Sequence, residues 1–313
     1  MAYHPSRVAG RKRFPFYLVV FLAPATIVYT LFMIYPLFDS LRLSFYSADS
    51  AGNEFFVGFE NYVRLFTDEL WKPRLWGAFW HNVVFFIIHM VVQNSVGLLL
   101  AALLTARTLR GRGFFRTVYF MPTMLSVVIV GFIWQLILSP LWGVAEGILG
   151  LVGLESLFQP WLGLEGPALI ALSFISVWQF IGIPMMLFYA TLISIPDELI
   201  EAATVDGASG WQTFWRIKFP LILPTVGIVA ILTYVGNFNA FDLIYTTQGA
   251  LAGPNFSTDI MGTFFYRTFF GQQLQLGNPT MGATVAAVMF LIILAGVLLY
   301  MFGYQRRVQT YEL

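Results

Sequence analysis

Polar side chains recur at helical spacing inside segments that are otherwise apolar. Residues three and four positions apart share one face of a helix, so their side chains act together. Two faces of this kind are Ser176, Gln179 and Phe180, and Thr233, Asn237, Ala240 and Phe241. Amides both donate and accept hydrogen bonds, which suits hydroxyl-rich ligands, and aromatic rings cover apolar ligand faces. The alternative for each polar residue alone is a hydrogen bond to a neighbouring helix.

Asn239 is expected to lie elsewhere, because two residues of helix turn it about 200° away from Asn237. His89, Gln93 and Asn94 are further polar residues of an apolar segment. We interpret His89 as a hydrogen-bonding residue between helices rather than a proton relay.

The sequence offers no catalytic constellation. It contains no Gly-x-x-x-x-Gly-Lys-Ser/Thr phosphate loop and no Ser-His-Asp arrangement, and it has no cysteine. The three histidines, at 4, 81 and 89, are too scattered to indicate a metal site. A net charge of +1 argues against nucleic-acid binding. Energy for any active process must therefore come from a partner.

Composition indicates a membrane protein. The 313 residues are 58% hydrophobic and 11% charged, whereas soluble domains carry about 25% charged residues. Segments this apolar satisfy their backbone internally only as helices, so the expected fold class is an all-α membrane protein. Six transmembrane helices are predicted, at about 14–38, 82–105, 116–138, 167–194, 220–245 and 281–303.

The distribution of basic residues predicts the topology. With both termini in the cytoplasm, 12 of the 17 Lys and Arg residues fall on the inner side. The expected organisation is a cytoplasmic segment 1–13, a six-span domain 14–305 and a cytoplasmic tail 306–313. An aromatic, charged stretch at 39–79 is expected to form a small outer cap of short interfacial helices. The stretch 246–280 is expected to be a glycine-rich outer loop.

The stretch 195–220 is a polar interruption between two apolar segments. Pro196 ends one helix and begins another, because proline suits a first helical turn. Ala202 and Ala203 favour a helix, and Gly207 supplies a left-handed residue at the bend. These residues predict a helix-turn-helix knuckle at a membrane surface.

The spacing in this stretch is similar to a known loop signature. Glu201-Ala202-Ala203 is followed after three residues by Gly207, and after nine more by Ile217, with Pro220 closing the pattern. On these residues the chain resembles the permease subunits of ATP-binding-cassette importers. Runs at 35–45 (Tyr-Pro to Ser-Phe) and 57–62 (Val-Gly to Asn-Tyr) are similar to the carbohydrate-type members, relatives of the larger maltose-permease subunit.

The resemblance implies roles for both groups of residues. The loop 195–220 would be a coupling helix that docks on an ATPase subunit, through Glu201, Ala202, Ala203, Asp206, Gly207 and Ala208. The sugar contacts of the maltose permease come from positions that match Thr123, Val127, Ser176, Gln179, Phe180, Thr233, Asn237 and Ala240. Phe241 joins this pocket by its spacing. Of the matched positions, only Asn237 keeps the residue type.

The resemblance also implies the setting. The expected protein is half of the translocation path of an ATP-driven, binding-protein-dependent sugar importer in the bacterial inner membrane, working by alternating access. Its partners would be a homologous second permease subunit, two cytosolic ATPase subunits that hold ATP and Mg, an external solute-binding protein and membrane lipid. The chain itself would need no cofactor. The alternatives are a permease for a polyol, glycerophosphodiester or polyamine, and a polytopic membrane glycosyl-transfer enzyme.

Overall fold

The structure is a computed structural model that describes residues 16–49, 52–106, 109–272 and 275–306. The predicted segment 1–13 and residues 307–313 of the predicted tail lie outside the described residues. Four helical segments are long and apolar enough to cross a membrane, and up to seven are if each of three bent pairs counts as one span. The four are Val19–Leu43, Trp71–Leu104, Gly210–Gln248 and Pro279–Gln305. The mostly helical character that the composition predicts is confirmed.

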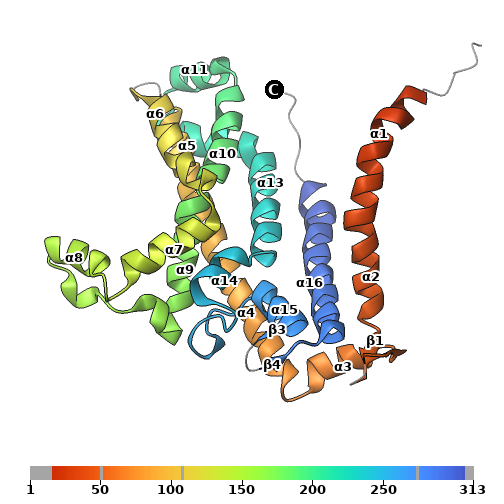
Figure 1. Ribbon diagram of the computed structural model, residues 1–313. Helices are drawn as coiled ribbons and strands as arrows, with labels where there is room; N and C mark the ends of the chain where they lie inside the picture. Colours follow the sequence, from red (N-terminus) through yellow and green to blue (C-terminus); the bar gives the residue numbers. More distant parts are fainter. Residues whose placement is uncertain (1–15, 50–51, 107–108, 273–274, 307–313) are drawn as a thin grey trace, which may run out of the picture.

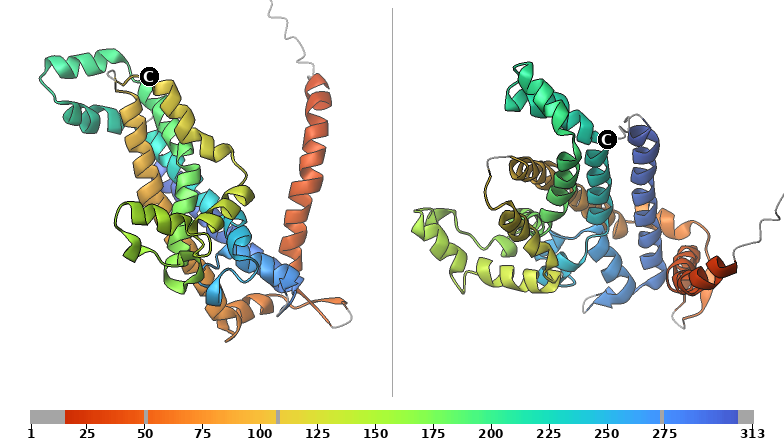
Figure 2. Two further views of the ribbon diagram at one scale, coloured as in Figure 1. Left: turned by 60° about the vertical axis from the view of Figure 1, so that its left-hand side comes forward. Right: turned by 90° about the horizontal axis from the view of Figure 1, so that it is seen from above.

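The first membrane segment stands apart from the others. It consists of α1 (Phe16–Tyr29), a π-helical turn and α2 (Tyr35–Leu43). In both views of Figure 2, α1 stands away from the remaining helices, and α2 packs against α16 (Pro279–Leu299). Large apolar side chains of this segment are exposed, such as Phe21 at 79% and Phe32 at 73%. An apolar surface of this size faces lipid or another protein chain.

The stretch 39–79, which was predicted to form a cap, contains a hairpin as well as the expected helix. Strands β1 (Tyr46–Ala48) and β2 (Glu54–Phe56) pair antiparallel, and α3 (Glu60–Thr67) follows. Asn61 donates to the carbonyls of Ser44 and Tyr46 at 3.0 and 2.8 Å, and the Ser44 and Tyr62 hydroxyls are 2.7 Å apart. The runs at 35–45 and 57–62 are therefore bonded to each other. An expectation of helices alone was wrong for this cap.

The second membrane segment begins earlier than expected. Helices α4 (Trp71–Ile88) and α5 (Asn94–Leu104) are joined by a π-helical turn at His89–Gln93 into one segment. Its first turn includes Pro73, which is tolerated there because that backbone nitrogen needs no intrahelical partner. The helix therefore begins at Trp71, before the predicted start at 82 and within the stretch 39–79.

The third predicted span is not one straight helix. Helix α6 (Arg112–Phe120), a 3-10 turn (Met121–Met124) and α7 (Val127–Leu138) are bent by 96°. Leu125 and Ser126 have an extended backbone, with ψ of 144° and 132°. The helical hydrogen bonds of the first half therefore end with the one from the Leu125 N–H to the Pro122 carbonyl. Beyond α7, α8 (Val144–Leu151) lies to one side of the bundle (Figure 1).

The next elements connect the bundle to its far end. Helices α9 (Glu165–Phe180) and α10 (Gly182–Ser194), with Ile181 between them, cover the predicted fourth span. They lead to α11 (Asp197–Val205), α12 (Gly210–Thr213) and then α13 (Phe219–Phe238). The α-helical geometry of α13 ends before the predicted 245, and a separate α14 (Asp242–Gln248) follows.

The stretch predicted as a glycine-rich loop is partly regular. It includes a short 3-10 turn, α15 (Met261–Phe270) and the strand pair β3 (Gly271–Gln272) and β4 (Gln275–Leu276). The predicted sixth span corresponds to α16 with a following π-helical turn that ends at Gln305.

Tyrosines fill spaces left by glycines between α13 and α16. The side chain of Tyr234 lies where a Cβ on Gly296 would sit, and Tyr304 lies in the same way against Gly227. The Tyr234 hydroxyl donates to the carbonyl of Ile292 at 2.6 Å. Small residues of this kind let membrane helices pack closely.

Buried apolar side chains join the remaining helices. One cluster, which includes Met185, Phe188 and Ile222, ties α5, α10 and α13 together. Another, which includes Phe264, joins α4, α15 and α16. In Figure 1 the start of α1, the end of α16 and α11 lie at one end of the molecule, and β1, α3 and β4 lie at the other.

Candidate functional site

A cavity of about 440 Å³ lies among the central helices, and most of the predicted pocket residues line it. It is bounded by α4, the π-helical turn after it, α9, α10, α13 and α14. The predicted residues that line it are Val127, Ser176, Phe180, Thr233, Asn237, Ala240 and Phe241. Their faces were chosen by helical spacing and resemblance, and the fold places them around one space.

Two of the predicted pocket residues do not line this cavity. The hydroxyl of Thr123 donates to the carbonyl of Phe120 at 2.6 Å, within its own turn. Gln179 is fully buried, and its Nε2 donates to the carbonyl of Leu125 at 3.1 Å. That carbonyl lies at the bend between α6 and α7, where no helical donor reaches it. Gln179 therefore satisfies an interrupted backbone, as membrane proteins require at such breaks.

Thr233 and Asn237 face the cavity from α13 and are held by their neighbours. Asn237 Nδ2 donates to the carbonyl of Thr233 at 2.7 Å, and the Thr233 hydroxyl donates to the carbonyl of Val229 at 2.8 Å. Asn94 Nδ2 donates to the Thr233 hydroxyl at 3.1 Å. Asn237 is 6% exposed, and its Oδ1 has no hydrogen-bond partner.

His89 and Gln93 line the same cavity, and the sequence analysis did not place them there. His89 Nδ1 lies 2.7 Å from the carbonyl of Phe85, and Nε2 lies 2.9 Å from the Ser176 hydroxyl. The structure confirms His89 as a hydrogen-bonding residue between helices. The signal was present, because His89 and Gln93 are four residues apart, like Thr233 and Asn237.

The expectation for Asn239 was wrong. The helical-wheel argument assumed that α13 continues past this residue, but Asn239 has a φ of −98° and a ψ of 4° at the end of the helix. The chain turns there, so Asn239 is exposed and lines the same cavity as Asn237. Asp242, at the start of α14, is also exposed and lines the cavity.

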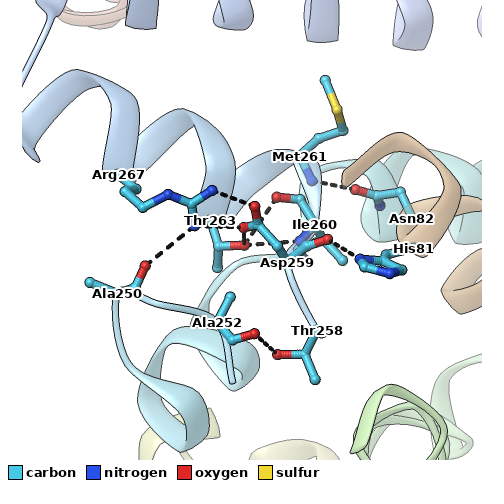
Figure 3. Close-up of polar contacts among 10 residues, drawn as sticks. All are labelled: His81, Asn82, Ala250, Ala252, Thr258, Asp259, Ile260, Met261, Thr263 and Arg267. Carbon is cyan, nitrogen blue, oxygen red and sulfur yellow. Dashed lines mark hydrogen bonds and ion pairs between the residues drawn. The ribbon is translucent and has the colours of Figure 1, made fainter. Parts of the chain in front are cut away.

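A buried polar network holds the end of the cavity where α13 gives way to α14 (Figure 3). Asn82 Nδ2 donates to the carbonyl of Asn237 at 2.8 Å, and its Oδ1 accepts from the backbone N–H of Met261 at 2.7 Å. Asp259 and Arg267 form a buried ion pair at 2.5 Å, and Thr263 donates to Asp259 at 2.7 Å. Burial raises the pKa of the Asp259 carboxyl, and the Arg267 charge acts in the opposite direction. The network ties α4, α13 and α15 together.

Gly262 allows the backbone of α15 to approach the backbone at Ala240 closely. A Cβ on Gly262 would overlap the carbonyl oxygen of Ala240. The first turn of α15 therefore rests directly on the backbone where α13 gives way to α14. The cavity wall at Ala240 and Phe241 is fixed by this contact as well as by Asn82.

A second hollow, of about 850 Å³, lies nearer to α12. Aromatic residues form one side of it, namely Trp211, Phe214, Trp215 and Phe219. Its lining is mostly apolar, with Asn94, Ser95, Thr105 and Lys218 among the exceptions. The smaller cavity offers buried polar groups that converge on one space, and so it is the better candidate for solute recognition.

The 195–220 segment forms the predicted helix-turn-helix knuckle. Gly207 has a φ of +78°, in the left-handed region, and ends α11. The N–H of Ala208 donates to the carbonyl of Ala203 at 2.9 Å, and the N–H of Gly207 donates to that of Thr204 at 3.1 Å. This pair of bonds is the Schellman motif. Ser209 then caps α12 in a reciprocal bond with Gln212.

Helix α11 presents an open surface. Among the predicted coupling residues, Glu201, Ala202, Asp206 and Gly207 are exposed, Ala208 is half-buried, and Ala203 is 6% exposed against the turn. Val205 is 87% exposed. The acidic Asp197 and Glu198 in the first turn match the positive end of the helix dipole. Within the described part of the chain, no group of three or more His, Cys, Asp or Glu residues is placed to hold a metal ion.

The fold and cavity define a polytopic helical membrane protein with a polar solute-sized space in its bundle. Residues 93–308 match the family described as "Binding-protein-dependent transport system inner membrane component". The chain belongs to this family, as a transport permease subunit rather than an enzyme.

Individual relatives cover most of the chain. It is 34% identical to the probable ABC transporter permease protein YurN of Bacillus subtilis, over 87% of this chain and 91% of that protein. It is 32% identical to the multiple sugar-binding transport system permease protein MsmF of Streptococcus mutans, over 87% and 90%. A chain of the crystal structure of a bacterial ABC transporter that imports the acidic polysaccharide alginate has a TM-score of 0.78, at 22% identity over 94% and 96%. That likeness supports the fold.

Proposed function

We propose that this chain forms half of the translocation path of an ATP-driven, binding-protein-dependent importer for a sugar or sugar-like solute. The observation that carries the proposal is the position of α11 in the chain. Helix α10 leads directly into α11, and α12 leads from it into α13. Both α10 and α13 line the cavity, through Pro184 and Leu187 on one side and Thr233 and Asn237 on the other. A force applied to α11 therefore acts on two cavity walls.

The proposed mechanism is alternating access. Two cytosolic ATPase subunits bind ATP and Mg, close together and move α11, which docks on one of them through the surface around Glu201, Asp206 and Gly207. A homologous second permease subunit supplies the other half of the path, and its own coupling helix docks on the second ATPase. The cavity then opens outward and receives the solute from an external binding protein, as the family description supports.

The solute class follows from the cavity chemistry and from the relatives. The wall combines amides and hydroxyls with Phe180 and Phe241, a mixture that suits a hydroxyl-rich ring. The MsmF name adds a sugar-transport relative. In this proposal six spans cross the bacterial inner membrane, with α11 and both termini on the cytoplasmic side.

Reconstitution tests the proposal. The chain is assembled with its cognate ATPase, second permease and binding-protein subunits, in liposomes with ATP inside the compartment that α11 faces. We expect uptake of a neutral oligosaccharide from a panel of maltose, lactose and raffinose that requires both ATP and the binding protein. A complex that assembles and hydrolyses ATP but carries no sugar would contradict the sugar assignment.

A further inference from the structure

We propose that this cavity selects uncharged solutes that donate hydrogen bonds, and that it rejects acidic sugars. The inference rests on the proposed function and narrows its substrate class. It depends on which atoms the cavity wall presents, and on the absence of a compensating positive charge among the described lining residues.

Ser176 presents a hydrogen-bond acceptor because His89 uses its proton. The carbonyl of Phe85, 2.7 Å from His89 Nδ1, can only accept, so Nδ1 carries the hydrogen. In the uncharged ring Nε2 is then an acceptor, and the Ser176 hydroxyl donates to it at 2.9 Å. Only the lone pairs of Ser176 Oγ remain for a ligand.

Asn237 holds a second acceptor just behind the cavity surface. Its Nδ2 donates to the carbonyl of Thr233 at 2.7 Å, and reversing the amide would place two oxygens against each other. Oδ1 is therefore the free atom, and it is buried without a partner in a residue that lines the cavity. Gln93 Oε1 is likewise buried and unpartnered. An unpaired buried acceptor is unfavourable, so a rotation of either side chain that brings its oxygen to a ligand hydroxyl is favoured.

The charges in the lining agree with these acceptors. Among the described residues that line the cavity, none is Lys or Arg, and Asp242 is the one with a formal charge. A carboxylate on a sugar would lose its hydration in the cavity and would lie near oxygen acceptors and the negative charge of Asp242. Burial of a charge without a partner is costly, so the wall disfavours uronates. We therefore expect this chain to reject acidic sugars, in contrast to the alginate importer, whose overall fold it shares.

The natural absence of cysteine provides a direct test. Leu232→Cys places a thiol in the cavity lining, and Leu151→Cys places one on α8, at an 88% exposed position away from the cavity and from α11, as a control. The assembled complex is labelled with a maleimide, with maltose, lactose or raffinose or with digalacturonate present. We expect at least one neutral sugar to slow labelling of Leu232→Cys three-fold or more, digalacturonate at equal concentration to have no effect, and Leu151→Cys to be unaffected by any sugar.

Substitutions identify the atoms responsible. In the Leu232→Cys chain, Ser176→Ala and Asn237→Ala should each raise the neutral-sugar concentration needed for half-protection about tenfold. Ser173→Ala is the matched control, because Ser173 lies one turn earlier on α9 and donates to the carbonyl of Leu169 at 2.7 Å. Unchanged half-protection in both cavity variants would overturn the assignment of the acceptors.

The outcomes separate this inference from the proposed function. Protection by digalacturonate equal to that by the neutral sugars overturns the selectivity, while sugar transport stands. If no sugar protects Leu232→Cys although the liposomes take up sugar with ATP, the cavity is not the binding site and the inference fails alone. If sugar uptake is also absent, the proposed function fails as well.

Discussion

Asn82 donates a hydrogen bond to the backbone carbonyl of Asn237 at 2.8 Å, across 155 residues of sequence. The bond fixes the last turn of α13, where Asn237 lines the cavity and holds its own oxygen buried without a partner. The other end of the Asn82 amide accepts from Met261, at the start of α15. One fully buried side chain therefore sets the position of a cavity residue against α15.

We expect Asn82→Leu to weaken solute binding as well as stability. It leaves the Met261 N–H buried without its partner, at a cost of about 1–3 kcal/mol, and removes the tie to the Asn237 carbonyl, which keeps the bond from the Ala240 N–H at 3.1 Å. The measurements are the melting temperature of the complex and sugar protection of Leu232→Cys. Thr284→Val is the control, because it removes buried bonds of α16 to Thr280 and Ser44 away from the cavity. If Asn82→Leu lowered the melting temperature but left protection as in Thr284→Val, Asn82 would have only a structural role.

The ion pair between Asp259 and Arg267 should be essential to the stability of the segment that contains α15. Arg267→Met leaves a buried carboxylate without its partner, and such changes cost about 3–5 kcal/mol. The double variant Asp259→Leu/Arg267→Met removes both charges and should be more stable than Arg267→Met alone. Thermal unfolding in detergent measures both.

The exposed pair of Arg42 and Asp39 gives the contrast for this experiment. Its side chains are 51% and 48% exposed, so Arg42→Met should destabilise the protein far less than Arg267→Met. Equal destabilisation by Arg42→Met and Arg267→Met would show that burial of the inner pair has no special effect.

The sequence predicts local structure here better than it predicts contacts between helices. The bend at Gly207 follows from a glycine between two short helical runs, which is a local signal. The fold instead decides the role of Gln179, because the carbonyl that it satisfies, at Leu125, belongs to a break in another helix. Ser176 and Asn237 reached the cavity because each lies on a helix that remains regular to its position. The same argument gave the wrong position for Asn239, because α13 ends one residue before it.

The position of the termini is open to a direct measurement. Twelve basic residues on one side predict that both ends are cytoplasmic. A reporter fused after Leu313 should therefore be active in the cytoplasm, and one fused near Gly153 should be active outside. Gly153 is a suitable site because a Cβ built there would meet no atom within 4 Å. An external reporter signal from the Leu313 fusion would contradict the six-span arrangement.

Gly207 should be required for coupling and not for membrane insertion. At a φ of +78° a β-branched residue is strained by roughly 1–2 kcal/mol, although a Cβ there would meet no atom within 4 Å. Gly207→Val should therefore weaken the Schellman turn that ends α11, and reduce ATPase association and sugar-stimulated hydrolysis. Gly207→Asn should lose less, because asparagine tolerates the left-handed region. Gly210→Ala is the control, since Gly210 is not in that region and also has open space around it. The amount of chain in the membrane fraction should be equal in all three variants. Full stimulated hydrolysis in the Gly207→Val complex would mean that the shape of this turn does not transmit the signal from the ATPase.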